Sequence, residues 1–248
     1  MKRRAFVLGL GAALSGAAGR DGALTNARAL SGGRFTAGGE EFLLADVVAP
    51  PLYALNEKTP PFFSEAKRAL QALLDAGALN AVDVAPQTRW GGRVVAARGQ
   101  NGETLQEALA RAGAVRIAPQ TDDLTFIDRL LSLEAAARSE RRGLWALSAY
   151  GVYTAEAAEG AVGAFHLIEG TVLRAVAARG RFYLNFGPDY RTDFTGGARS
   201  ALYRKWARDG FDLAALEGAR VRIRGFVERI NGPSVDIRHV RQIETLKN

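Results

Sequence analysis

Apolar residues recur every three or four positions in three segments of the first half of the chain, and this spacing predicts three amphipathic helices. The helices cover residues 64–76, 104–112 and 123–142. Residues 104–107 (TLQE) have the composition of a capping box, which marks the start of the second helix. Runs of strand-forming residues lie between the helices, at 41–48, 79–84, 93–98 and 115–118. The first half therefore combines a sheet with three helices.

The second half of the chain changes to patterns typical of strands. Strand-like runs lie at 165–177, 181–186, 220–229 and 234–238, and one helical segment at 201–209 interrupts them. Asn231-Gly232 supplies a hairpin turn. In outline these runs and the helix match an OB-fold barrel, which has five short strands with a helix between the third and the fourth. Residues 153–163, rich in Ala, Glu and Gly, predict a linker in front of it.

The N-terminus has the anatomy of a signal peptide, which we assign to residues 1–30. Lys2, Arg3 and Arg4 precede an apolar run of about 14 residues, which is short for a membrane span of about 20. The two arginines resemble the start of a twin-arginine export signal. Cleavage is expected near residues 16–18 or near 27–29. The mature protein is then predicted to be periplasmic, without a stable membrane span, with domains at 31–150 and 164–248 and a linker at 151–163.

Charge and composition limit the partners and the kinds of site that the protein can have. The 248 residues carry a formal charge of +7 with a pI near 10.0, and most of the cations are arginines. Such a surface favours an anionic partner, although it also serves solubility alone. The chain has no Cys and only two His, which excludes disulfides, thiolate chemistry and Cys- or multi-His metal sites.

Several segments of the first half, taken together and in order, resemble the thermonuclease (staphylococcal-nuclease-like) family. They cover about residues 32–150, and the most telling is an acidic, alanine-rich helix that ends in RRGLW. The matching segments are 43–50 (LLADVVAP), 88–96 (TRWGGRVVA), 105–109 (LQEAL), 113–116 (GAVR), 133–138 (LEAAAR) and 141–145 (RRGLW). The resemblance implies an OB-like five-stranded barrel with helices packed on it.

By the resemblance, enzymes of this family cleave phosphodiesters with a calcium ion, two arginines and a glutamate. The metal neutralises phosphate charge, the arginines stabilise the transition state, and the glutamate activates water. By the resemblance, the first arginine falls on Leu43, the metal-binding aspartate on Val48 and the glutamate on Pro51. The upstream Asp-Gly-Asp-Thr run is replaced by residues 36–39 (TAGG). Only the second arginine remains, matched by Arg93 or, less well, by Arg89.

These replacements favour a domain that does not cut. Asp46 lies two residues before Val48, on the same face of the predicted strand. One carboxylate is a poor calcium site, because calcium takes 6–8 oxygen ligands. We therefore assign no metal or cofactor. Calcium is expected only under the alternative that the domain is a nuclease with a rearranged site.

The second domain resembles the OB-like extension that follows thermonuclease-like domains in some bacterial proteins. On such a barrel, aromatic side chains stack on bases while arginines contact phosphates. Arg220, Arg222 and Arg224 alternate along one strand and so share a face. The candidate binding residues are Arg181, Tyr183, Arg220, Arg222, Arg224 and Arg238.

The predicted fold is mainly β with α, as two OB-like five-stranded barrels of which the first carries three helices. Trp145, directly after the third helix, is expected to pack between the two domains. The predicted function is an exported, catalytically inactive thermonuclease-like protein that binds nucleic acid or another polyanion. Two alternatives stay open: a metal-dependent phosphodiesterase with a rearranged site, and a module that contacts an envelope protein.

Overall fold

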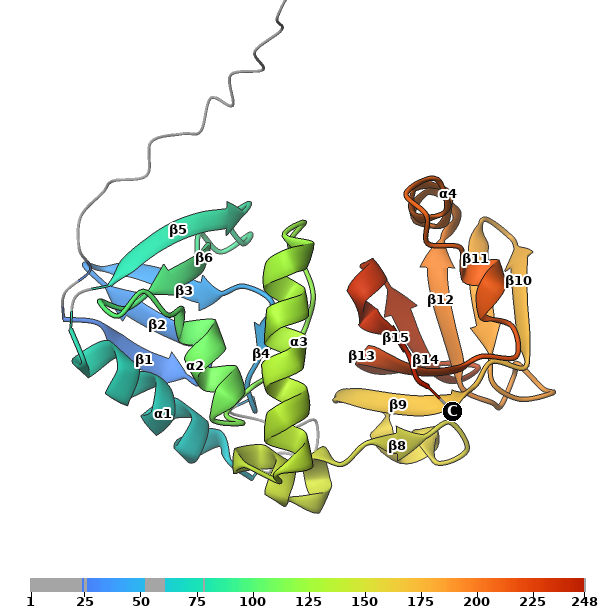
Figure 1. Cartoon of the computed structure of the whole chain (residues 1–248), viewed down its shortest axis with the longest axis horizontal. Helices are drawn as coiled ribbons and strands as arrows, with labels where there is room; N and C mark the ends of the chain where they lie inside the picture. Colours follow the sequence, from blue (N-terminus) through green and yellow to red (C-terminus); the bar gives the residue numbers. More distant parts are fainter. Residues whose placement is uncertain (1–23, 25, 52–60, 78, 248) are drawn as a thin grey trace, which may run out of the picture.

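Two curled sheets, one from each half of the chain, form barrels that lie side by side with a long helix between them (Figure 1). The computed structural model describes residues 24, 26–51, 61–77 and 79–247. The predicted signal sequence up to residue 23 and the loop between Pro51 and Pro61 lie outside the described residues.

The first barrel has the strand order β1-β2-β3-β6-β5, and β3 and β6 are parallel while the other neighbours are antiparallel. A bridge between Leu24 and Leu79 brings the two outer strands together. A separate pair of short strands, β4 and β7, follows the sheet. The strands are β1 (Arg28–Ser31), β2 (Arg34–Ala37), β3 (Glu40–Leu44), β4 (Val47–Val48), β5 (Asn80–Ala85), β6 (Arg93–Arg98) and β7 (Arg116–Ile117).

All three predicted helices are confirmed, as α1 (Phe63–Asp75), α2 (Leu105–Arg111) and α3 (Leu124–Ser139). The capping box is also present, because Thr104 and Glu107 each accept a hydrogen bond from the backbone N–H of the other.

The sheet begins earlier than the boundary at residue 31. Strand β1 starts at Arg28, and Ala29 is only 1% exposed in the first core. Short strands separated by Gly32-Gly33 lack the long alternation that identifies a strand in a sequence. For this reason β1 and β2 were not predicted.

The second barrel has the order β10-β11-β12-β14-β13-β9, again with one parallel pair, β12 and β14. Helix α4 (Ser200–Arg208) connects β12 to β13, so the second barrel has the topology expected of an OB-like fold. The added strand β15 (Ile243–Thr245) pairs with β13. The barrel strands are β9 (Phe165–Thr171), β10 (Arg174–Ala178), β11 (Arg181–Asn185), β12 (Thr195–Arg199), β13 (Arg220–Ile230) and β14 (Gly232–Ile237).

Residues 153–163 are part of the second barrel and not a linker. Strand β8 (Tyr153–Thr154) pairs with β9, and a short 3-10 helix, η3 (Ala158–Ala161), follows it. Ala155, Ala158 and Ala161 are buried in the second core. Alanines three residues apart are packing positions here, which composition alone does not separate from a flexible segment.

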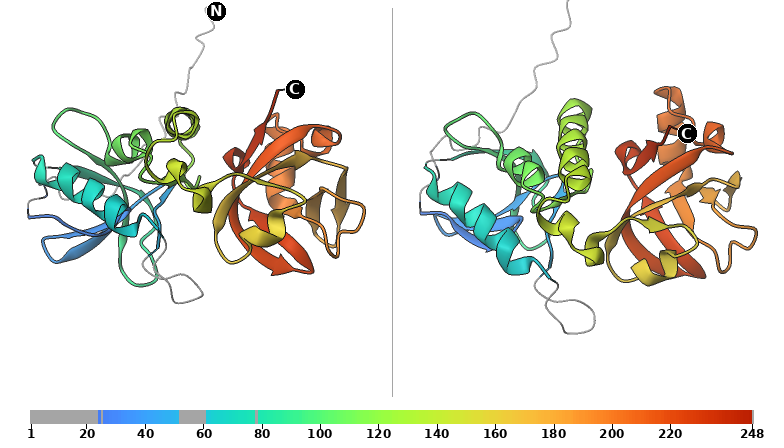
Figure 2. Two further views of the ribbon diagram at one scale, coloured as in Figure 1. Left: turned by 90° about the horizontal axis from the view of Figure 1, so that it is seen from below. Right: turned by 60° about the horizontal axis from the view of Figure 1, so that its bottom comes forward.

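The true connection is made by two 3-10 helices, η1 (Gly143–Ala146) and η2 (Ser148–Tyr150), which lead from α3 into β8 (Figure 2). A small third core lies at this junction and contains Trp145 together with Leu167 of the second barrel, as predicted. The Tyr150 hydroxyl donates to the carbonyl oxygen of Pro61 at 2.6 Å. Further 3-10 helices are η4 (Leu213–Leu216) and η5 (Val240–Gln242).

Candidate functional site

The positions that the resemblance aligns with the family's catalytic residues carry no acidic or basic side chain. Leu43 lies on β3 and is half-buried, with a methyl carbon close to Gly92. Val48 ends the short strand β4, and Pro51 is exposed just after it. The run 36–39 forms the end of β2 and its turn into β3, where Gly38 and Gly39 both have positive φ. None of these positions offers an oxygen ligand or a proton acceptor on an acidic side chain.

Arg93 does not point toward these positions. Phe42 pairs with Arg93 and Leu43 pairs with Val94, so Arg93 lies on the core side of the sheet and Leu43 on the other. The guanidinium lies 5.1 Å from the centre of the buried Phe42 ring. It makes two 2.9 Å hydrogen bonds to Asp83 and one of 3.2 Å to Glu40. The charge of Arg93 is therefore balanced by the two carboxylates. Their hydrogen bonds, that of Asp83 above all, hold the pKa of Arg93 above its usual value.

Arg89, the weaker match, lies in the β5–β6 loop. Its guanidinium is 4.2 Å from the ring centre of Trp90, which is 81% exposed. The loop is held by Thr88, whose backbone N–H donates to Gly92 and whose side chain accepts from the same residue. Arg89 and Trp90 form a projecting pair on this loop.

Asp46 was expected on a strand face, but it lies in the turn between β3 and β4 with a φ of 61°. Its carboxylate is buried and accepts hydrogen bonds from the Gln120 N–H (2.7 Å), the Thr121 N–H (3.0 Å) and the Thr121 hydroxyl (2.7 Å). Positive φ is tolerated by Asp, and the turn breaks the predicted strand at 41–48. Asp46 therefore stabilises a loop and is not available to a cation.

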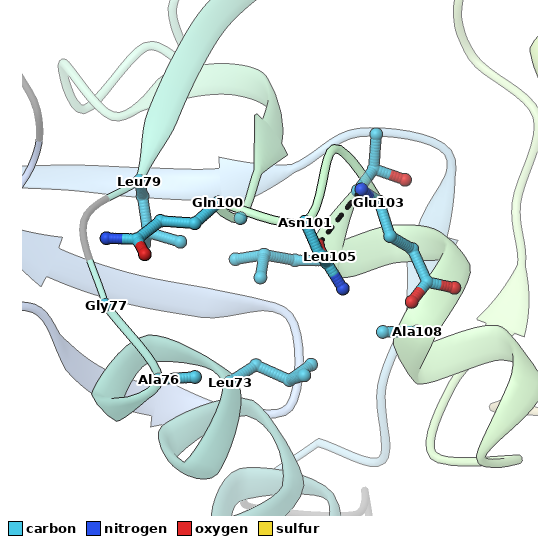
Figure 3. A pocket seen from close by; sticks show the side chains of 11 residues that line it. Leu73, Ala76, Gly77, Leu79, Gln100, Asn101, Glu103, Leu105 and Ala108 are labelled. Carbon is cyan, nitrogen blue, oxygen red and sulfur yellow. Dashed lines mark hydrogen bonds between the residues drawn. The ribbon is translucent and has the colours of Figure 1, made fainter.

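A hollow of about 220 Å³ opens in the first barrel between α1 and the loop from β6 to α2 (Figure 3). Its walls are mainly apolar, with Leu73, Leu79 and Leu105 among them. The rim residue Glu103 is bound to Arg111, with a closest approach of 2.6 Å. The side chains that line it provide no cluster of acidic groups for catalysis.

Arg220, Arg222 and Arg224 share one face of β13, as predicted. On that face all three arginines bind carboxylates, and Arg224 also contacts the first domain. Arg220 pairs with Glu169 at 3.0 Å and is half-exposed. Arg222 bonds the same Glu169 at 2.5 and 2.9 Å and reaches Glu244 at 3.1 Å.

Arg224 is buried, with 1% of its side chain exposed. It pairs with Glu134 of α3 at 2.8 Å and with Glu244, and it donates to the carbonyl oxygen of Ile117 at 3.0 Å. Burial alone would raise the pKa of Glu244, but the nearby arginines, Arg224 above all, hold that pKa below its usual value. The assignment of Arg224 to a phosphate-binding surface is therefore wrong. Most hydrogen-bond donors of the Arg222 guanidinium are likewise occupied, by Glu169 and Glu244. A strand pattern shows which face a residue takes but not which acids cover that face.

Arg181 and Arg238 lie on the outer face of the second barrel and both bind Asp236, at 2.5 and 2.6 Å. Burial would raise the pKa of Asp236, but the two arginines hold it below its usual value. Arg238 keeps 78% of its side chain exposed, whereas Arg181 is 31% exposed. Tyr183 is half-buried on the same face, where it leans over Gly197.

The structure adds a groove on this face that the sequence did not predict. Two hollows of about 410 and 370 Å³ share Arg174, Asn185 and Tyr190 in their walls. Tyr183 lines the second hollow, together with Arg179 at the tip of the β10–β11 turn. Tyr190 is 55% exposed, and the Arg191 guanidinium lies 5.5 Å from its ring centre. We call these two hollows the outer groove.

The arginines around the outer groove differ from those of β13 in having no carboxylate partner. Arg174 and Arg179 line the groove, and Arg191 lies against Tyr190. Among the residues that the structure describes, none of these three arginines forms a salt bridge, and all are exposed. Arg174 shares one face of β10 with Val176 and Ala178, which also line the groove, but the alanine-rich run 174–178 has no polar–apolar alternation that marks this face as the outer one. Arg179-Gly180, by contrast, has the form of a hairpin turn, with φ values of 48° and 78°.

Both histidines make structural contacts. His166 is buried in β9 against the edge of Tyr153, and burial lowers its pKa to about 4, with a smaller effect from Arg116. His239 caps η5 by accepting from the Arg241 N–H at 3.0 Å. Within the described part of the chain, no three His, Asp or Glu side chains gather as a metal site would need. No helix in that part is both long and apolar enough to cross a membrane.

A family model matches part of the chain. Residues 41–147 match the family model described as "Staphylococcal nuclease homologue", which agrees with the strand order and helices of the first barrel. No curated protein matches the chain. Residues 41–147 therefore form a domain of the staphylococcal nuclease homologue family.

Proposed function

We propose that this protein is exported and binds nucleic acid without cutting it, with binding carried by the outer groove of the second barrel. The observation that supports this most is the contrast between Arg93 and the groove arginines. The one arginine left from the family's catalytic set is neutralised by two carboxylates, whereas the arginines around the groove have none among the described residues.

The loss of cleavage follows from the chemistry of the transition state. Phosphodiester hydrolysis needs groups that stabilise charge developing on the phosphate, and removing one such group costs about 10²–10³ in rate. Leu43, Val48 and Pro51 supply none of these groups. Asp83 and Glu40 do lie together, but both carboxylates bind Arg93, so a cation would have to displace its guanidinium. This arrangement argues against a nuclease with a rearranged site.

The binding half of the proposal rests on the outer groove. Tyr183 lines it, Tyr190 is more than half-exposed beside it, and Arg174 and Arg179 border it. Single strands bind OB-like barrels through aromatic rings that stack on bases and through cations that follow the backbone. Neither Arg174 nor Arg179 forms a salt bridge with a described residue, so a phosphate does not have to displace a bound carboxylate. Glu217 also lines the groove, where it accepts a hydrogen bond from the Ala175 N–H at 2.9 Å.

A protein-binding role is the second candidate. The β5–β6 hairpin exposes Val82 (57%), Val84 (38%) and Trp90 (81%), which form an apolar patch on the first barrel. Such patches are common at contacts between proteins. Nothing on this patch selects a partner, so we rank it below nucleic-acid binding.

Two assays test the proposal on the full mature chain. Incubation with calcium and single- or double-stranded DNA or RNA should give no turnover, and turnover that Arg93→Ala abolishes would contradict the proposal. Fluorescence anisotropy with labelled oligonucleotides across a salt series should show binding that weakens as salt rises. Absence of binding at low salt would leave the protein-binding role as the better candidate.

Export is tested by mass spectrometry of the protein taken from the cell envelope. Because Leu24 bridges Leu79 and β1 begins at Arg28, cleavage at 27–29 would remove part of the first sheet. We therefore expect the mature chain to start before Leu24, near residues 16–18. An intact Met1 in a cytoplasmic pool would contradict export.

A further inference from the structure

A third hollow of about 520 Å³ lies where the two barrels meet. One side is formed by the chain after β7, at Ala118, Pro119 and Gln120, and the other by β9, β13 and β14 of the second barrel. We call it the junction hollow. Ligand sites occur preferentially between domains, because two surfaces can enclose a ligand there.

The junction hollow lies on the same outer sheet face as the outer groove. Ser234 of β14 lines the groove, and its register partner Glu228 of β13 lines the hollow. Tyr183 pairs with Gly197, which pairs with Asp236. Continuing the β13–β14 register by one residue places Phe226 next to Asp236. Tyr183 and Phe226 are thus three strand spacings apart, roughly 14 Å.

The junction hollow provides an aromatic platform. Phe226 is 51% exposed although it lies in the middle of a long strand, and it lines the hollow. Its register partner Phe165 is half-buried and lines the hollow too. Exposed Phe in a strand is costly to keep in water, whereas a flat ring at this place can stack on another aromatic ring.

The polar groups of the junction hollow include an acid that can bind a base. Asp236 is already bound by Arg181 and Arg238, so this group of three is positive overall, and Arg238 lines the hollow. Glu228 is exposed and forms no salt bridge with any described residue. A free carboxylate repels a phosphate, but it accepts a hydrogen bond from an exocyclic amino group such as that of cytosine.

The junction hollow is held in shape by contacts between the two barrels. Arg241 binds Asp128 of α3 through two hydrogen bonds, at 2.6 and 2.8 Å. Gln242 forms part of the floor and donates to the carbonyl oxygen of Arg224 at 3.0 Å. A site fixed before the ligand arrives loses less entropy on binding.

We propose that the junction hollow receives one base of a single strand whose neighbouring nucleotides lie in the outer groove. The base stacks on Phe226, and Glu228 accepts a hydrogen bond from its amino group, which favours cytosine over thymine. This inference rests on the proposed nucleic-acid binding and adds to it a base site to which both domains contribute.

The test is anisotropy with labelled oligo-dC and oligo-dT of equal length, and with a duplex, at several salt concentrations. Phe226→Ser should weaken single-strand binding about 5- to 150-fold, the range expected for one stacked base, and leave the salt slope unchanged. Phe226→Tyr should bind like the unaltered protein. Glu228→Gln should remove most of the preference for oligo-dC over oligo-dT.

Leu30→Ser is the control, because Leu30 is also an exposed apolar side chain on a strand (38%) but lies on β1 of the first barrel; this variant should bind normally. Failure of the unaltered protein to bind any oligonucleotide would overturn both proposals. Binding that Phe226→Ser leaves intact would overturn the base site alone and leave the outer groove standing. Binding of free cytidine as tight as that of the oligonucleotide would also overturn it, since the site would then be a nucleoside pocket.

Discussion

The second barrel carries arginines on two surfaces with opposite surroundings. Arg222 and Arg224 lie on the β13 surface that meets α3, where Glu134, Glu169 and Glu244 bind them. The arginines of the outer groove have no acidic partner among the described residues. An arginine that is matched by a buried acid contributes to stability, and one that is left free in water is available to a ligand. The contrast teaches that charge on a strand becomes informative only once its partners are known.

The largest effect on stability is expected from breaking the buried ion pair between Arg224 and Glu134. Arg224→Met leaves Glu134 as a buried charge, with the N–H of Ile117 (2.7 Å) and the more distant Arg138 (3.6 Å) as its remaining partners. We expect the free energy of unfolding to fall by about 3–5 kcal/mol. Urea denaturation followed by fluorescence measures it. Arg220→Ala removes an exposed pair on the same strand and should cost less than about 1 kcal/mol, so equal losses would contradict the assignment.

A second effect concerns pH at the same junction. The pKa of His166 is about 4 in the folded chain and about 6.5 when unfolded, so the unfolded state binds the extra proton between these values. Stability is therefore retained above pH 6.5 and lost as pH falls toward 4, by on the order of 3 kcal/mol. His166→Gln should flatten this part of the pH–stability curve, measured by thermal unfolding. An unchanged curve would show that other groups dominate.

A smaller effect on stability is expected from removing Arg93 of the first barrel, whose charge is balanced by two carboxylates. Arg93→Ala removes the contacts with Asp83, Glu40 and Phe42 and should lower the free energy of unfolding by about 1–2 kcal/mol. Because Arg93 is already occupied by acids, oligonucleotide affinity should not change. Weaker binding at unchanged stability would instead place Arg93 in a binding site.

The smallest change in free energy is expected for the unpaired arginines of the outer groove, and it concerns oligonucleotide binding. Changing Arg174 and Arg179 together to Ala should weaken single-strand binding on the order of tenfold at low salt and flatten the salt slope by about 1.4. Unfolding should stay the same, since neither arginine has an acidic partner in the described structure. Arg68→Ala, which alters an exposed pair on α1, is the control and should leave both quantities unchanged. If Arg68→Ala flattens the slope equally, the groove is not the binding surface.

Much of the fold could be predicted because local signals agreed with it. The periodicity of α1, the capping box of α2 and the Asn231-Gly232 turn all depend on residues close in sequence. The errors came where short segments depend on distant partners. Strand β1 is held by β2 and by Gln71 of α1, and the supposed linker is held by β9.

The sequence by itself determined the two-barrel plan and the residues at the positions that the resemblance aligns with the family's catalytic groups. Leu43, Val48 and Pro51 can be read directly, and no arrangement in space gives them a charge. Only the tertiary structure decided which arginines are free. Glu169 lies 53 residues before Arg222, and Glu134 lies 90 positions before Arg224, yet each pair is in contact. Such pairing depends on which strands and helices fold against one another, which the alternation of one strand does not encode.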